Sequence, residues 1–302
     1  MCIRDRPYIV KAGWRTWLLV KIETDEGITG WGECSDRNPQ SIAGMIHDLT
    51  PKLIGQDPRP FEMRYWDMYR VTRSGGRGTA AKAMAGIELA LLYIKARALN
   101  ISVVELFGGP TRDKVRVYWS HCGTNRMREY HIPGLPPLHS MADVHALGRE
   151  VVERGFTAMK TNILFPGNPG HMHSGGATTG PNSTDQVADK AMVDHIVTLM
   201  GTFRDAIGPD TDLILDLNFN FKPEGCIEIA RALEPLKLLW LEIDMLDPLA
   251  LSQVKASTQT RICTAETLFY MREYLPFFQH QAADVMMIDV PWNGFSQSKK
   301  IG

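Results

Sequence analysis

Four acidic residues in the second half of the chain each close a short apolar run. The runs are Leu213 to Leu215 before Asp216, Leu238 to Leu241 before Glu242, Ile262 to Ala265 before Glu266, and Val285 to Ile288 before Asp289. The acids follow one another at steps of 26, 24 and 23 residues (216 to 242, 242 to 266, 266 to 289), about one strand plus one helix each. In a parallel barrel such acids emerge at one rim. Three carboxylates at one rim are typical of a site for a hard divalent cation.

Other interpretations remain open for single residues. Any one of these acids, taken alone, is compatible with a helix N-cap or a solvated loop. Lys160 closes a similar run, Phe156 to Met159, and a lysine at a strand end is commonly a surface residue. His171 and His173 form a His-x-His pair in a glycine-rich stretch, which by itself is a weak metal signal. The regular spacing of the acids, rather than any one residue, favours a metal site.

The elements that must position these residues alternate after Arg112. Six strand-like runs occur, at 115–119, at 156–160 and before each of the four acids, with helical patterns between them. This alternation predicts a parallel sheet and an α/β fold. A closed TIM-type barrel needs about eight strands, so residues 115–302 are predicted to form an incomplete (β/α) barrel. The segment 165–185, rich in glycine, histidine and proline, is predicted to be a long loop, either a lid or a plain connection.

The first 114 residues have a different character. Residues 17–24 and 28–34 flank a turn at Asp25-Glu26-Gly27 and predict a β-hairpin. Helical patterns follow at 41–53, 60–70 and 78–99, the last rich in alanine. Residues 1–114 are therefore predicted to be a separate α+β domain. The first six residues do not have the pattern of a strand.

Composition excludes several classes of function. Lys+Arg 33 against Asp+Glu 34 gives a net charge of −1, which does not suggest binding to nucleic acid or to an anionic membrane. The five cysteines are scattered without a Cys-x-x-Cys pair, as expected of reduced thiols in a cytoplasmic protein. No apolar run approaches the ~18 residues that a membrane helix needs.

Taken as a set, these motifs resemble the mandelate racemase and muconate lactonizing enzyme family of the enolase superfamily, in its acid-sugar dehydratase branch. The acid ladder with Lys160 upstream resembles the barrel of that family. Three N-terminal motifs resemble its capping domain: Thr24 to Gly27 leading to Gly30-Trp31-Gly32-Glu33, Ala85 to Ala90, and Leu106 to Gly109. The resemblance covers residues 17 to the end and implies a partial barrel beneath an α+β cap.

The resemblance also implies roles for individual residues. Asp216, Glu242 and Glu266 are similar to the three ligands of an essential Mg²⁺. Lys160 occupies the first lysine of the family's Lys-x-Lys motif, whereas the second is replaced by Asn162, which argues against a two-base racemase. Asp289 matches the aspartate that orients a catalytic histidine. That histidine is expected beyond Gly302, so the chain reads as a C-terminally truncated fragment.

The implied activity is that of a hydro-lyase in carbohydrate acid catabolism. An aldonate or aldarate would lose the proton next to its carboxylate, Mg²⁺ would stabilise the enediolate, and the β-hydroxyl would leave. Lys160 would either place a charge near the substrate carboxylate or, with a lowered pKa, carry a proton. Asn162, Asn218 and Arg77 are expected to contact the substrate.

Two alternatives stay open. One is a racemase or epimerase of a hydroxy acid that uses the same enediolate chemistry. The other is a catalytically inactive fragment that lacks the base histidine. The family resemblance further implies a homo-oligomer in the full-length form.

Overall fold

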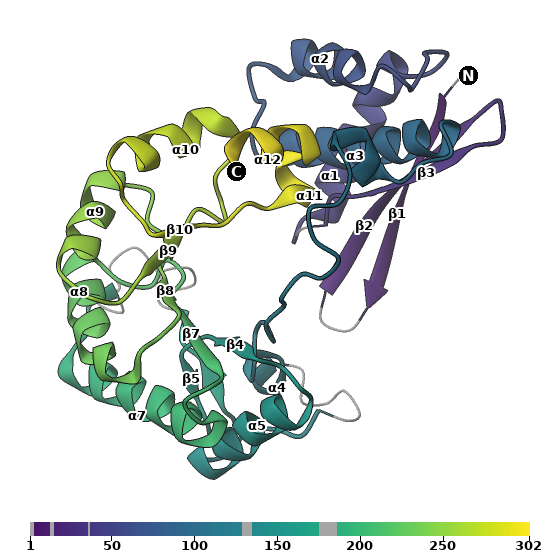
Figure 1. The fold of residues 1–302 in the computed structure, drawn as a ribbon. Coiled ribbons are helices and arrows are strands. Elements are labelled where there is room, and N and C mark those ends of the chain that lie inside the picture. Colours follow the sequence, from purple (N-terminus) through teal and green to yellow (C-terminus); the bar gives the residue numbers. More distant parts are fainter. Residues whose placement is uncertain (1–2, 13–14, 36, 129–134, 175–185) are drawn as a thin grey trace. The chain divides into compact units, whose positions relative to one another are not determined.

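A computed structural model describes residues 3–12, 15–35, 37–128, 135–174 and 186–302 (Figure 1). The chain divides into two compact units. The first unit comprises Met1–Lys114, Thr267–Tyr274 and Ile288–Gly302. The second comprises Val115–Glu266 and Leu275–Met287.

The first unit contains a three-stranded antiparallel sheet in the order β1 (Ile3–Ala12), β2 (Arg15–Thr24), β3 (Thr29–Glu33). The predicted hairpin is confirmed as β2 and β3. The expectation that residues 1–6 contain no strand is wrong for residues 3–6, since Ile3 pairs with Thr24 and Arg6 with Lys21. β1 is an edge strand, where charged side chains are readily accommodated, so its charged opening does not prevent main-chain pairing.

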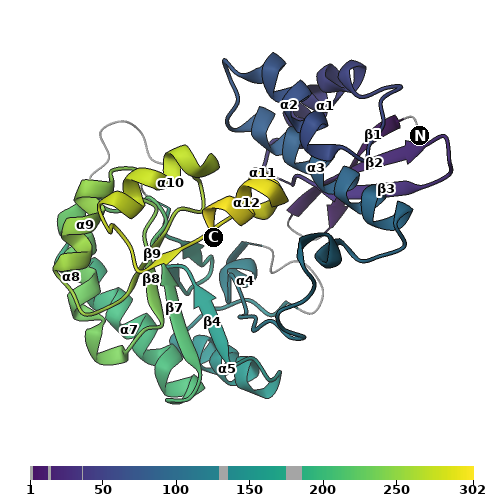
Figure 2. The ribbon, with the colours of Figure 1, turned by 45° about the horizontal axis from the view of Figure 1, so that its top comes forward.

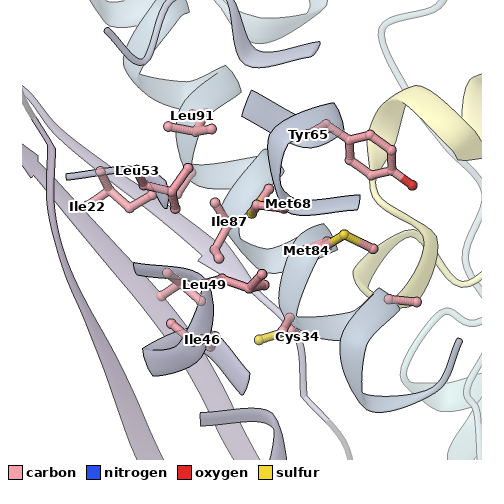
Figure 3. Close-up of a cluster of buried hydrophobic side chains, with 14 of the residues drawn as sticks. Ile22, Cys34, Ile46, Leu49, Leu53, Tyr65, Met68, Met84, Ile87 and Leu91 are labelled. Carbon is pink, nitrogen blue, oxygen red and sulfur yellow. The ribbon is translucent and has the colours of Figure 1, made fainter. Parts of the chain in front are cut away.

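Helices pack against one face of this sheet to form the core of the first unit. The main helices are α1 (Pro39–Leu49), α2 (Phe61–Thr72) and α3 (Thr79–Ala98), with short 3-10 turns η1 (Thr50–Lys52) and η2 (Val103–Phe107). Figure 3 shows Ile22 of β2, Ile46 of α1, Met68 of α2 and Ile87 of α3 within one cluster of buried side chains. The three predicted helices are confirmed.

Glycine permits the close approach between β3 and α3. A Cβ atom on Gly32 would lie only 1.9 Å from the carbonyl oxygen of Gly86. A side chain at position 32 would therefore push the helix away from the sheet. Two short C-terminal helices, α11 (Val290–Asn293) and α12 (Phe295–Ile301), also contact α3.

The second unit contains a five-stranded parallel sheet in the order β10, β9, β8, β7, β4. Its strands are β4 (Ala158–Thr161), β7 (Asp212–Asp216), β8 (Trp240–Glu242), β9 (Ile262–Thr264) and β10 (Val285–Met286). The connecting helices are α5 (Met141–Glu153), α7 (Lys190–Ile207), α8 (Pro223–Ala232) and α9 (Pro248–Ala256). Figures 1 and 2 show these helices along the outer side of the strands. The predicted α/β fold with a parallel, barrel-like sheet is thus confirmed.

The smaller elements complete the description. They are α4 (Thr124–Arg128), the antiparallel pair β5 (Leu164–Phe165) and β6 (His171–Met172), η4 (Glu234–Leu236), and α10 (Tyr270–Gln279), whose residues are shared between the two units. None of the helices within the described ranges is long and apolar enough to cross a membrane.

The strand predicted at 115–119 is wrong in extent. Only Trp119 bridges to the sheet, opposite Met159, and its main chain exchanges hydrogen bonds with Ala158 and Lys160 at 3.0 and 2.9 Å. Val115 and Val117 are instead exposed. Residues 115–118 therefore do not contribute a buried strand to the sheet.

The predicted long loop at 165–185 contains short regular structure at its beginning. Phe165 lies between two imidazoles, with ring centroids 4.8 Å from His171 and 3.9 Å from His195. This stacking gives His171 a packing role, in line with the weak metal signal of the His-x-His pair. Residues 175–185, which the lid interpretation includes, lie outside the described residues.

Candidate active site

The parallel register brings acids together at the carboxyl ends of the strands. Asp216 ends β7 and lies directly opposite Glu242, which ends β8. Glu242 in turn pairs with Cys263 of β9, and Glu266 follows that strand by two residues. The prediction that these acids follow successive parallel strands is confirmed. Their role as metal ligands stays a prediction.

Lys160 lies between two of the acids. Its ammonium is 3.0 and 2.9 Å from the two carboxylate oxygens of Glu242 and 3.5 Å from Oδ2 of Asp216. Burial by itself would lower the pKa of Lys160, but the carboxylates of Glu242 and Asp216 outweigh it and raise that pKa above its ordinary value. These two carboxylates therefore favour the charged ammonium of Lys160 in this arrangement, and its role as a fixed charge or as a proton carrier stays a prediction.

The pKa of Glu242 is raised. Burial is the main cause, the nearby Asp216 adds to it, and Lys160 opposes both. Two buried carboxylates thus share one ammonium. This is an electrostatically costly arrangement that additional positive charge would relieve.

A network of amide side chains surrounds Asp216. The backbone N–H and side-chain Nδ2 of Asn218 donate to Oδ1 of Asp216 at 2.8 and 2.7 Å. Asn162 Nδ2 donates to Asn218 Oδ1 at 3.5 Å, while Asn162 Oδ1 accepts from the Thr124 hydroxyl at 2.7 Å and lies 3.2 Å from His121 Nδ1. Asn218 is therefore a direct neighbour of Asp216, and Asn162 is linked to Asp216 through Asn218. Their contact with substrate stays a prediction.

Sequence reasoning missed His121 and Thr124. They follow the bridge at Trp119, where the chain continues beside β4, and Cys122 N donates to the Lys160 carbonyl at 2.8 Å. The available signal was the apolar run at 115–119, whose continuation had to end at the same rim as Lys160.

Positive φ values occur at three residues beside these strand ends. Asn218, His121 and Ala265 have φ values of 51°, 50° and 89°. Non-glycine residues seldom adopt such values, and buried examples are often found at functional sites. Ala265 is buried and immediately precedes Glu266, so this strained turn sets the direction in which the Glu266 carboxylate leaves β9.

A fourth acid, Asp244, also belongs to this group and was missed. Its backbone N–H donates to the carbonyl of Asn218 at 3.1 Å. Burial, with smaller effects of Asp216 and Glu266, raises the pKa of Asp244 to about 7. The available signal was its position two residues after Glu242, which places both side chains on the same side of an extended chain.

The donor set fits a hard divalent cation. Carboxylate oxygens dominate it, and burial raises the pKa of the nearby Cys263, which therefore stays a neutral thiol and a poor competitor. Among the described residues, no three His, Cys, Asp or Glu side chains are already arranged as a set of metal ligands. In this structure the positive charge between Asp216 and Glu242 is the ammonium of Lys160.

Two further predicted site residues belong to the first unit. Arg77 forms an ion pair with Glu273. Asp289 occupies the N-cap position of α11, where its carbonyl accepts from Asn293 N at 2.9 Å. Their predicted roles toward substrate and toward a catalytic histidine stay predictions.

Known protein families match both parts of the chain. Residues 10–108 match the N-terminal domain of mandelate racemase and muconate lactonizing enzymes, and residues 143–302 match the enolase C-terminal domain-like family. A D-galactonate dehydratase of Klebsiella pneumoniae is 31% identical over 261 residues, which cover 85% of this chain and 60% of that protein. A D-galactonate dehydratase of Xanthomonas oryzae is 30% identical with the same coverage. The chain thus spans about 60% of the length of these relatives.

Solved structures of other proteins also resemble this chain. A Burkholderia xenovorans protein with the provisional name L-alanine-DL-glutamate epimerase, bound to magnesium and fumarate, superposes with a TM-score of 0.92 at 36% identity, covering 99% of this chain and 75% of that one. A mandelate racemase/muconate lactonizing enzyme-like protein of Rubrobacter xylanophilus gives a TM-score of 0.84 at 27% identity, covering 99% and 75%. With both domain models matched and the acids at successive strand ends, the chain belongs to the mandelate racemase and muconate lactonizing enzyme family of the enolase superfamily.

Proposed function

We propose that the protein is a Mg²⁺-dependent dehydratase of a sugar acid, an aldonate or aldarate. The observation that carries this proposal is the set of carboxylates of Asp216, Glu242 and Glu266 at or just beyond the ends of successive strands, with Lys160 in contact with the first two. The D-galactonate dehydratases among its relatives support the substrate class.

Asp216, Glu242 and Glu266 would hold the cation, which when bound supplies a Lewis acid for the carboxylate oxygens of the substrate. Asn218 keeps Asp216 in place through two hydrogen bonds to Oδ1, so Oδ2, which lies 3.5 Å from Lys160 Nζ, is the oxygen that a cation would take over. The ammonium of Lys160, displaced from these acids by the cation, would contribute an electrostatic partner for the negative charge that develops when the α-proton leaves.

Asn162 favours dehydration over two-base racemisation. Its side chain is a neutral amide, fixed by the Thr124 hydroxyl and facing Asn218, so β4 presents only one basic residue to the site. A racemase of this type needs a base on each face of the α-carbon. The epimerase name of the Burkholderia protein keeps epimerisation as the competing outcome of the assay.

The test is a panel of aldonates and aldarates incubated in D₂O with protein expressed from the whole open reading frame, followed by proton NMR. A dehydratase gives a 2-keto-3-deoxy product only when Mg²⁺ is present. Deuterium at the α-carbon without loss of water would instead assign epimerisation. A folded protein that binds Mn²⁺ yet changes no member of the panel contradicts both activities.

A further inference from the structure

Asp244 is a buried acid without a hydrogen-bond donor for one of its oxygens. The residue is 8% exposed, and its Oδ1 accepts no hydrogen bond from any described residue. A buried oxygen in this state carries a substantial desolvation penalty, more so when it is charged. Such groups in native proteins commonly mark the position of an ion, a water or a ligand.

The position of Asp244 identifies what it faces. It follows Glu242 by two residues, and its backbone N–H is held by the carbonyl of Asn218, the residue whose side chain holds Asp216. Asp244 is therefore placed beside the acids at the ends of β7 and β8.

The charge balance of this group points in the same direction. Lys160 bonds Glu242 and approaches Asp216, but no comparable contact compensates Asp244 among the described residues. Asp216, Glu242 and Asp244 with one lysine leave an excess of negative charge, because one ammonium offsets only one carboxylate. A divalent cation would offset most of that excess.

We propose that Asp244 is a fourth acidic member of the cation site, whose orphaned oxygen accepts a hydrogen bond from a water on the divalent cation held at Asp216, Glu242 and Glu266. This inference rests on the proposed function, since it requires that cation. Asp244 acts as a positioning residue: it fixes the water and adds charge. Acceptors that hold a group bound to the metal in this way typically strengthen metal binding by about 10–100-fold.

The test is calorimetric titration of this chain with Mn²⁺ alone, which requires no substrate. Asp244→Asn keeps the size of the side chain and removes its charge. The expected result is affinity weakened about 10-fold or more, with one site per chain retained. The matched control is Asp247→Asn, which makes the same change three residues later at the N-cap of α9, where asparagine also serves as a cap. The control is expected to bind Mn²⁺ like the unmodified chain.

Thermal unfolding in EDTA separates this role from a structural one. Because Asp244→Asn removes a buried charge, the variant is expected to melt at the same or a higher temperature than the unmodified chain when no cation is present. Its melting temperature is expected to rise less than that of the unmodified chain when Mn²⁺ is added. If asparagine prevents folding, Asp244→Ser provides the same readout. Equal Mn²⁺ affinity in the unmodified chain and the Asp244 variant overturns this inference and leaves the proposed function intact. Failure of the unmodified chain to bind Mn²⁺ removes both.

Discussion

The ammonium of Lys160 lies 2.9 Å from Oε2 of Glu242, and both side chains are buried. Replacing one partner of such a buried ion pair strongly destabilises the fold, because the charge of the other partner is left unpaired in the interior. The pair links the end of β4 to the end of β8 across β7, and it occupies the position where two of the candidate metal ligands meet.

Lys160→Met is therefore expected to lower the free energy of unfolding by about 3–5 kcal/mol in the presence of EDTA. Excess MgCl₂ should restore part of that loss, because a cation that binds only the folded state stabilises it by mass action. Urea denaturation with and without Mg²⁺ measures both effects. Lys190→Met is the control: Lys190 is an exposed lysine of α7 paired with Asp194, so its replacement should change stability little. A Lys160 variant as stable as the control would contradict the account.

Asn218 offers a way to separate backbone strain from side-chain orientation. At φ 51°, Asn218→Gly relieves strain and Asn218→Ala adds it, while both remove the Nδ2 hydrogen bond to Asp216. Because the hydrogen bond is lost in both, Asn218→Ala should be less stable than Asn218→Gly by about 1 kcal/mol. Both variants should bind Mn²⁺ about 10-fold more weakly. Thermal melts and titration calorimetry provide the two readouts, and unchanged Mn²⁺ affinity in both variants would show that Asn218 does not orient Asp216 for a cation.

Ala265 provides an independent test of strain beside Glu266. Its φ of 89° is unfavourable for any residue with a Cβ. Ala265→Gly is expected to change the free energy of unfolding by about 0 to +1 kcal/mol, since relieved strain exceeds or matches the entropic cost of glycine. Ala265→Val should destabilise strongly, because a branched side chain meets both strain and a packed site. Urea denaturation distinguishes them, and a clear loss of stability in the glycine variant would refute the strained turn.

The spacing of acids predicted strand ends well where the backbone stays extended. β7 ends at Asp216, and β8 ends at Glu242. β9 ends at Thr264, because Ala265 adopts a positive φ before Glu266. β10 ends at Met286, shortly before α11, which has Pro291 in its first turn. Local conformation of this kind is not encoded in an apolar run.

Other features depend on tertiary pairing and could not be predicted from the sequence. β1 forms despite its charged opening, since β2 supplies the hydrogen bonds. Val117 alternates with Trp119 as a strand residue would, yet only Trp119 has a partner on β4. Asp244 follows no apolar run of its own, so its inclusion among the acids became visible only through its burial and its contact with Asn218.

Glu88 predicts a pH dependence in the first unit. This residue of α3 is fully buried; Oε1 accepts from Ser296 N at 3.1 Å, and Oε2 has no donor within the described part of the chain. Burial raises the pKa of Glu88, opposed by its hydrogen bonding with Ser296. The Glu88 carboxyl therefore stays protonated to a higher pH in the folded protein than in the unfolded chain. Its contribution to the free energy of unfolding falls as the pH rises from about 4.5 through the folded pKa.

Glu88→Gln should remove that dependence. The variant is expected to be more stable than the unmodified chain at neutral pH by about 1–3 kcal/mol, the cost of an unsatisfied buried group. The difference should disappear toward pH 4, where Glu88 is protonated in both states. Urea denaturation across this range measures it, with the exposed Glu62→Gln of α2 as the matched control. A difference in the free energy of unfolding between the two chains that grows toward acid pH would contradict a raised pKa of Glu88.

Asp216, Glu242 and Glu266 are proposed to hold one divalent cation. Anomalous scattering from crystals grown with Mn²⁺ tests this assignment without reference to activity, because the signal locates the cation. We expect one strong peak in contact with all three carboxylates, with the ammonium of Lys160 withdrawn from between Glu242 and Asp216. Crystals that hold Mn²⁺ only at other residues, with Lys160 still bridging those two acids, would contradict it.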